Sequence, residues 1–134
     1  MVDATSPIVI VTIALRMEAH KPTALVVDDD AALRMLCRVN LELEGFSVRE
    51  AGTLTDAEAA VDAERPDVVL LDVHLGGEES TRLLEHLRAE GIPVALVTGS
   101  ADMRDLGAAD AVLPKPFEPR ELVEVARRLA RVGT

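Results

Sequence analysis

The stretch VVDDDAALRML, residues 26–36, decides the predicted fold, because a short apolar run stops abruptly at three consecutive aspartates. The β-branched residues before the aspartates suit a buried strand, and the leucines after them have helical spacing. Asp30 suits the N-cap of that helix. A strand that leads directly into a helix is typical of sheets whose parallel strands are joined by helices. The stretch also raises a question: why do three like charges gather where a buried strand ends?

The rest of the chain repeats the alternation of strand and helix from residue 23 onward. We expect strands over residues 24–27, 46–51, 68–71, 94–97 and 111–113. We expect helices over residues 30–44, from the capping-box pair Thr55 and Glu58 to residue 64, over 79–90, and over 119–132. This order predicts an α/β fold, a doubly wound, five-stranded parallel sheet with helices on both faces.

The length of 134 residues suits one domain, which we place at residues 23–134, with residues 1–22 as an N-terminal extension. The extension holds the apolar run SPIVIVTIAL, residues 6–15, which is shorter than the roughly 20 residues that cross a bilayer. We therefore expect no membrane span. The run is either an extra strand or an upstream extension that pairs with a sheet edge or covers a helical face.

The composition argues against several kinds of partner and site. A net charge of −10 repels phosphate backbones, and a chain with two Phe and no Trp or Tyr lacks stacking platforms, so we expect no nucleic-acid binding. Cys37 is the only cysteine, which excludes an intramolecular disulfide and favours a cytoplasmic location. The three histidines lack the close spacing of helical metal sites.

Polar residues follow four of the predicted strands. Asp28 and Asp29 follow the first strand, Asp72 ends the third, Thr98 ends the fourth, and Lys115 follows the fifth. In a doubly wound sheet, functional groups collect beyond the carboxyl ends of the strands. Three carboxylates that converge there repel one another unless a hard cation such as Mg²⁺ takes up their charge. The set indicates phosphoryl chemistry on a carboxylate nucleophile.

The motifs VVDD (26–29), VVLLD (68–72), VTG (97–99) and PKPF (114–117), in this order and at these strand ends, resemble the receiver domain of bacterial two-component response regulators. The resemblance covers roughly residues 23–132 and implies a flavodoxin-like receiver fold with strand order 2-1-3-4-5. It implies that Asp72 accepts a phosphoryl group from a phosphohistidine of a sensor histidine kinase or histidine phosphotransfer protein. The chain would then be a signalling protein rather than an enzyme, assisting its own phosphorylation and dephosphorylation.

The resemblance also assigns the remaining site residues. Asp28 and Asp29 match the acidic pair that holds Mg²⁺ together with Asp72, and the backbone carbonyl of His74 is a further expected ligand. Thr98 matches the switch hydroxyl that turns toward the phosphoryl group. Lys115 matches the lysine that pairs with that group, and its bond to the following proline would be cis.

Three departures from the receiver pattern point to a divergent subclass. Val112 occupies the position where receivers usually carry a Tyr or Phe switch. The segment between Thr98 and Lys115 is shorter than usual, which predicts a reduced fourth helix. Gly76 and Gly77 stand in the loop after the phosphoacceptor, where a proline is usual. The chemistry is preserved, and we expect Thr98 and the short loop to couple phosphorylation to the surface.

We expect a stand-alone receiver, a monomer or weak homodimer, that signals through contacts with a downstream protein as relay, phosphate sink or effector. The alternative is a pseudo-receiver, a binding scaffold that has the fold and is never phosphorylated. A flavodoxin-like enzyme is disfavoured, because no glycine-rich phosphate loop follows the first strand. Taken singly, the acidic pair could be helix caps, Thr98 a strand-end hydroxyl and Lys115 a solvated side chain.

Overall fold

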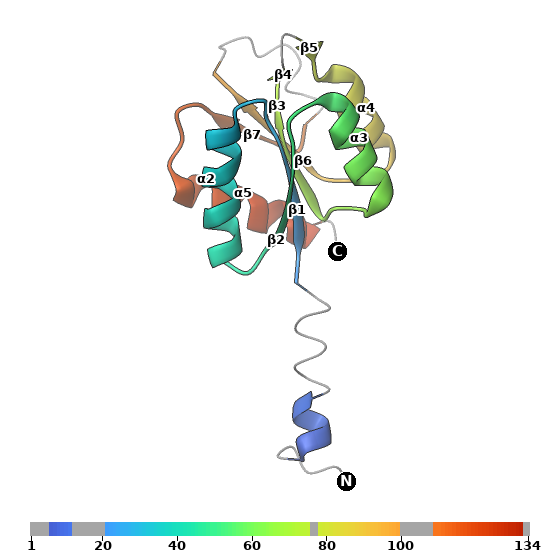
Figure 1. Cartoon of the computed structure of the whole chain (residues 1–134), viewed down its shortest axis with the longest axis vertical. Helices are drawn as coiled ribbons and strands as arrows, with labels where there is room; N and C mark the ends of the chain where they lie inside the picture. Colours follow the sequence, from blue (N-terminus) through green and yellow to red (C-terminus); the bar gives the residue numbers. More distant parts are fainter. Residues whose placement is uncertain (1–5, 12–20, 76–77, 100–108, 133–134) are drawn as a thin grey trace.

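The computed structural model describes residues 6–11, 21–75, 78–99 and 109–132. Five strands form one sheet in the order β2-β1-β3-β6-β7, and every neighbouring pair is parallel (Figure 1). The strands are β1 (Thr23–Val27), β2 (Ser47–Ala51), β3 (Val68–Asp72), β6 (Val94–Thr98) and β7 (Ala111–Pro114). This order is the predicted 2-1-3-4-5 of a flavodoxin-like sheet, so the predicted topology is confirmed.

The helices that cover the sheet in the described residues are α2 (Ala31–Leu43), α3 (Leu54–Ala63), α4 (Thr81–Ala89) and α5 (Pro119–Val132). Helices α2 and α5 cover one face of the sheet, and α3 and α4 cover the other (Figure 1). Successive side chains of a strand point to opposite faces, so Val26 packs with α2 and α5 while Val27 packs with α3 and α4. Strands β3 and β6 are buried along their whole length, as expected for central strands of a parallel sheet.

The start of α2 is where the sequence places it. The Asp30 side chain accepts hydrogen bonds from the backbone N–H groups of Ala32 and Leu33, at 3.0 and 3.3 Å. It is therefore the N-cap. Gly45 follows the helix with φ of +95°, a left-handed conformation that glycine adopts without strain. These two residues bound the helix that follows the acidic stretch.

The predicted start of the next helix is wrong by two residues. The N-cap of α3 is Thr53 rather than Thr55, because the Thr53 hydroxyl accepts the N–H of Asp56 at 3.0 Å. Thr53 has an extended backbone, and the helix begins with Leu54, which packs against the buried cluster beneath α3. Both threonines suit a cap, and the packing of Leu54 favours the earlier start.

The sequence did not predict the short hairpin that precedes α4. Strands β4 (His74–Leu75) and β5 (Glu78–Glu79) pair antiparallel, so α4 begins at Thr81 rather than at residue 79. Two-residue strands carry too little periodicity to be recognised in a sequence. The hairpin begins two residues after Asp72, beyond the carboxyl end of β3 (Figure 1).

Within the described part of the N-terminal run, residues 7–11 are helical, so the extra-strand alternative is wrong for them. β-branched residues favour strands only when a neighbouring strand pairs with them, and the five-stranded sheet does not include this segment. The predicted reduced fourth helix falls on residues 100–108, which lie outside the described residues. Among the helices that are described, none has the length and apolar character to span a bilayer.

Candidate functional site

The sheet brings the predicted site residues to one edge. Val27 pairs with Leu71, so Asp28, the first residue after β1, lies beside Asp72, the last residue of β3. Because all five strands are parallel, their carboxyl ends lie at the same edge, at the point where the crossovers diverge to opposite faces. The expectation that the acidic residues converge rests on this geometry, and the structure bears it out.

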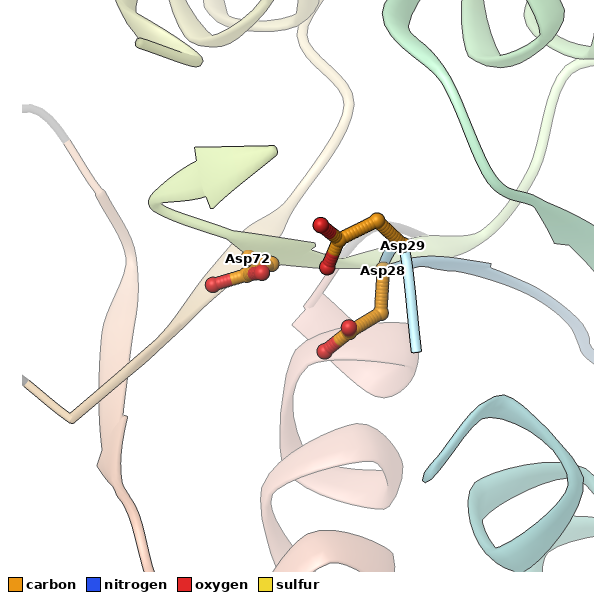
Figure 2. Close-up of side chains that lie close together, drawn as sticks. All are labelled: Asp28, Asp29 and Asp72. Atoms are coloured by element: carbon orange, nitrogen blue, oxygen red, sulfur yellow. The ribbon is translucent and has the colours of Figure 1, made fainter. Parts of the chain in front are cut away.

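Three carboxylates meet at this edge. Asp28, Asp29 and Asp72 each offer a carboxylate oxygen, and these oxygens all lie within 4.8 Å of one another (Figure 2). Asp28 is only 4% exposed and Asp72 8%, whereas Asp29 is exposed to solvent. Like charges this close and this buried repel one another strongly. Nearby positive charge would therefore stabilise the three carboxylates. We refer to these three residues together with Lys115 as the acidic pocket.

Lys115 supplies part of that charge. Its Nζ lies 3.3 Å from Asp28 Oδ2 and 3.6 Å from Asp72 Oδ1, so one ammonium group faces two of the three carboxylates. The Lys115 backbone N–H donates to the Thr98 carbonyl at 2.8 Å, which ties the residue to the end of β6. The Lys115–Pro116 bond is cis, as the resemblance implied. The lysine side chain is 30% exposed, so the pocket is open to solvent on its side.

The donor set fits Mg²⁺. Hard divalent cations prefer oxygen ligands, and Mg²⁺ in proteins is usually held by one or two carboxylates with the remaining positions left to water and phosphoryl oxygens. Asp28, Asp29 and Asp72 provide such carboxylates at a spacing that one ion could share. The single positive charge of Lys115 is smaller than the summed negative charge of the three carboxylates. The residues present therefore suit the metal that receiver domains use.

Thr98 lies on the strand beside Asp72 and His74 follows Asp72 along the chain, and the roles expected of both stay predictions. Thr98 is buried at the end of β6, one residue beyond Val97, which pairs with Asp72. Thr98 is thus on the strand next to Asp72. His74 lies in β4, two residues after Asp72, and its carbonyl stays a predicted metal ligand. Val112, at the position of the usual aromatic switch, is half-buried in β7.

Two residues that hold the backbone of the site were missed by the sequence reasoning. The buried Ser80 hydroxyl donates to the Asp72 carbonyl at 2.6 Å. Arg34 Nη1 donates to the Asp28 carbonyl, also at 2.6 Å. For Ser80 the sequence offered one signal, a serine next to the predicted start of α4. Ser80 is the N-cap residue of α4, but its side chain makes no cap hydrogen bond and is therefore able to contact Asp72. The Arg34 contact spans six residues, a spacing that no regular element brings together.

Cys37 lies in the core near the site and does not act as a nucleophile there. The pKa of its thiol is raised from 9.0 to about 12, mainly by burial and in part by the negative charge of Asp28, while Lys115 opposes the shift. A thiol with this pKa is protonated at neutral pH, and the thiolate is the reactive form. Its role is that of a small apolar residue packed between α2 and the sheet.

Comparison with known proteins agrees with this geometry. The family model of the response regulator receiver domain matches residues 24–127. The DNA-binding response regulator MtrA of Mycobacterium tuberculosis is 39% identical over 122 residues, covering 86% of this chain and 54% of MtrA. The phosphate regulon transcriptional regulatory protein PhoB of Pseudomonas aeruginosa is 35% identical over 118 residues, covering 81% of this chain and 52% of PhoB.

A solved structure shows the same fold over nearly the whole of its own chain. The CheY-like response regulator receiver domain protein from Methanospirillum hungatei JF-1 superposes with a TM-score of 0.77 and 34% identity, covering 84% of this chain and 95% of that one. This chain spans about half the length of the curated relatives that it matches. Sequence, fold and acidic pocket agree, and the chain belongs to the response regulator receiver domain family.

Proposed function

We propose that Asp72 accepts a phosphoryl group from a phosphohistidine of a sensor histidine kinase or a histidine phosphotransfer protein. The observation that carries the proposal is the acidic pocket itself, in which three carboxylates converge and Lys115 Nζ lies within 3.6 Å of both Asp28 and Asp72. Carboxylates gathered this closely repel one another, and such clusters are typical of functional sites.

In the proposed reaction, an oxygen of the Asp72 carboxylate attacks the phosphorus of the phosphohistidine. The new bond is an acyl phosphate, and the phosphorus–nitrogen bond breaks with its electron pair leaving on the imidazole, which takes up a proton. Ser80 holds the Asp72 backbone, and the sheet holds its Cα, so the nucleophile is positioned before the donor arrives. Catalysis of phosphoryl transfer rests largely on such alignment and on charge neutralisation.

Asp28, Asp29, Asp72 and the backbone carbonyl of His74 would hold Mg²⁺, and Asp28 is held in place by its burial and by the hydrogen bond that it accepts from the Asp30 N–H. When bound, Mg²⁺ neutralises charge on the carboxylates and on the phosphoryl oxygens. Lys115 leaves its carboxylate contacts in part and pairs with a phosphoryl oxygen. The Thr98 hydroxyl, on the strand next to Asp72, donates to another of these oxygens.

We further propose that the receiver domain occupies residues 23–134 and that its output passes through protein contacts in the cytoplasm, as a monomer or weak homodimer. MtrA is a DNA-binding regulator, yet the match to it covers 54% of that protein, and the net charge of −10 disfavours DNA binding by this chain. Thr98 and the loop after it would carry the signal, because Val112 offers no aromatic switch.

The competing proposal is a pseudo-receiver that binds a partner without being phosphorylated. The replacement of the usual aromatic switch by Val112 favours it, because a receiver without that side chain has lost part of the usual output device. It does not explain the acidic pocket, whose carboxylates a pure scaffold has no need to keep together.

Incubation with acetyl phosphate separates the two proposals. With Mg²⁺ the protein should gain one phosphoryl group, seen by intact-protein mass spectrometry, and with EDTA it should gain none. Asp72→Asn should abolish the gain, while the control Asp62→Asn, on an exposed carboxylate of α3, should leave it unchanged. Absence of labelling in the wild-type protein under these conditions would favour the pseudo-receiver.

A further inference from the structure

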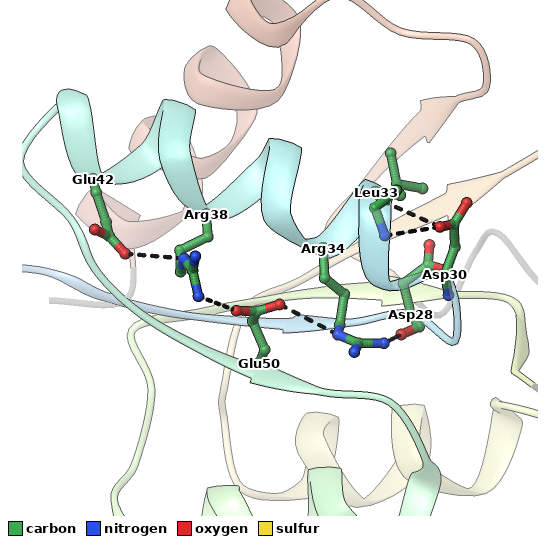
Figure 3. Close-up of polar contacts among 8 residues, drawn as sticks. Asp28, Asp30, Leu33, Arg34, Arg38, Glu42 and Glu50 are labelled. Atoms are coloured by element: carbon green, nitrogen blue, oxygen red, sulfur yellow. Dashed lines mark hydrogen bonds and ion pairs between the residues drawn. The ribbon is translucent and has the colours of Figure 1, made fainter.

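Arg34 links the acidic pocket to the edge of the sheet. It lies in the first turns of α2, and its Nη1 donates to the backbone carbonyl of Asp28 at 2.6 Å (Figure 3). Its Nε donates to Glu50 Oε1 at 3.3 Å. The guanidinium is planar and rigid, so two contacts made by different nitrogens fix its orientation as well as its position.

Glu50 is itself held from a second side. It lies on β2, where it pairs in register with Val26 of β1, and its other carboxylate oxygen accepts a hydrogen bond from Arg38 Nη1 at 2.7 Å. The side chains of Arg34 and Glu50 are only 20% and 24% exposed. Arg38 in turn pairs with Glu42 at 3.5 Å (Figure 3). We call these four residues the arginine–glutamate network.

The backbone at Gly52 leaves room for the Arg34 guanidinium. A Cβ placed on Gly52 would lie 3.0 Å from Arg34 Nη1 and 3.5 Å from its Cζ. The first of these distances is closer than a comfortable van der Waals contact. The same nitrogen that reaches the Asp28 carbonyl thus lies close to this glycine, and a side chain at residue 52 would crowd the guanidinium.

Asp28 has each of its backbone groups occupied by a different element. Its N–H donates to the carbonyl of Ala51 at 3.1 Å, and its C=O accepts from Arg34. Its Oδ1 accepts the N–H of Asp30 at 2.9 Å, which leaves Oδ2 turned toward Lys115. The Asp28 carbonyl belongs to the peptide group that leads into Asp29, so Arg34 holds the orientation of the backbone between these two carboxylates.

We propose that Arg34, anchored by Glu50, is a positioning residue that keeps the carboxylates of Asp28 and Asp29 aimed at a shared divalent cation. This inference rests on the proposed function, since it takes the acidic pocket to be a Mg²⁺ site. Residues that orient metal ligands through a hydrogen bond typically change metal affinity by about 10- to 100-fold when they are removed. Arg34 acts on the ligand through its backbone, with no contact to the metal.

The charge of Arg34 and its proposed positioning role predict opposite changes in Mg²⁺ affinity when Arg34 is removed. The positive charge of the Arg34 guanidinium repels Mg²⁺. If charge alone mattered, the removal of Arg34 should therefore tighten Mg²⁺ binding. If Arg34 acts by positioning, its removal should weaken Mg²⁺ binding although the pocket becomes more negative. The sign of the change in affinity distinguishes the two roles.

The experiment is a MgCl₂ titration of each variant followed by amide NMR shifts, at a temperature where each variant is folded. We expect Arg34→Gln to lose about tenfold in Mg²⁺ affinity. Arg34→Lys keeps the charge but not the fork of donors, and it should also bind more weakly than the wild type. The matched control is Arg38→Gln, which removes the same charge one turn later from the same Glu50 and should stay within about twofold.

Unchanged or tighter binding by Arg34→Gln would overturn the inference, and so would an equal loss in Arg38→Gln. If Arg34→Gln does not fold, Glu50→Gln removes the charged anchor instead and should weaken binding several-fold, with unchanged binding counting against the inference. Urea unfolding without Mg²⁺ gives a second readout, because a merely structural role would lower stability and leave the affinity of the folded protein alone. A wild-type protein that binds no Mg²⁺ would instead refute the proposed function.

Discussion

The acidic pocket and the arginine–glutamate network are joined at Asp28 and differ in the balance of their charges. In the network, two arginines face two glutamates, so every charge has a partner within the protein. In the pocket, three carboxylates converge to within 4.8 Å of one another and Lys115 faces two of them, so negative charges outnumber positive charges among these four residues. A balanced cluster supports the fold, whereas an unbalanced one is suited to a ligand that supplies the missing charge.

The two clusters also differ in how the fold holds them. The network joins α2 to the edge strand β2 through side chains with intermediate or high exposure. The pocket is placed by the ends of the buried strands β1 and β3 and by the loop after β7. The difference implies that substitutions in the network reach the metal site only indirectly, through the backbone of Asp28, whereas substitutions in the pocket remove a metal ligand or the ammonium group beside it.

The largest effect is expected from Lys115→Met, which keeps an apolar stem beside Leu33 and Phe117 and removes the ammonium group. Two carboxylates then lose a cation at 3.3 and 3.6 Å, so the free energy of unfolding in EDTA should fall by about 1–2 kcal/mol, discounted for the partial exposure of the lysine. Mg²⁺ affinity should rise, because the ion no longer competes with the ammonium group. Urea unfolding and the NMR titration measure these two quantities.

The comparison would break if Lys115→Met weakened Mg²⁺ binding, since the lysine would then support the site rather than compete for it. Arg38→Gln in the network is the matched control. It removes a charge from a pair whose arginine is 40% exposed, and it should change the free energy of unfolding by less than about 0.5 kcal/mol.

A smaller effect is expected from the metal itself. Mg²⁺ at about ten times its dissociation constant should stabilise the wild-type protein by roughly 1.4 kcal/mol, because it binds the folded state and not the unfolded chain. Asp28→Asn should remove this stabilisation, whereas Glu42→Gln, which removes a carboxylate of the network, should retain it. Thermal unfolding with and without Mg²⁺ gives the comparison. Equal stabilisation of both variants would place the ion outside the pocket.

The sequence predicts the pocket better than the network, and the reason is physical. Asp28, Asp29 and Asp72 follow apolar runs, and parallel strands end at one edge, so their convergence follows from the topology alone. Asp30 also caps α2 as expected, since capping is local. The roles assigned to Thr98 and the His74 carbonyl stay predictions.

The network depends on how long side chains lie once helix and sheet have packed. Arg34 reaches Glu50 across sixteen residues and Asp28 across six, and neither spacing belongs to a helix or strand period. The hydroxyl of Ser80 reaches back to Asp72 in a similar way, which is why its part in the site was missed. The β-branched run that includes residues 7–11 shows the converse limit, since its residues favour strands but have no partner strand there.

The smallest effect on stability is expected from Cys37, because charged residues of both clusters shift the pKa of its thiol. Burial, Asp28 of the pocket and Glu50 of the network all raise its pKa, to about 12 from 9.0, while Lys115 lowers it. The folded protein thus keeps the thiol protonated at a pH where the unfolded chain releases the proton. Its contribution to stability is complete below pH 9 and is lost as the pH rises toward about 12.

Between pH 8 and 9.5, the wild-type protein should therefore lose about 0.8 kcal/mol more of its free energy of unfolding than Cys37→Ala does. This figure depends on the unfolded pKa and requires only that the folded pKa lie well above it. Lysines titrate in the same range in both proteins, so the difference between the two urea-unfolding curves isolates the thiol. Parallel losses would mean that the thiol ionises in the folded state, and that Lys115 outweighs burial and the carboxylates of both clusters at Cys37.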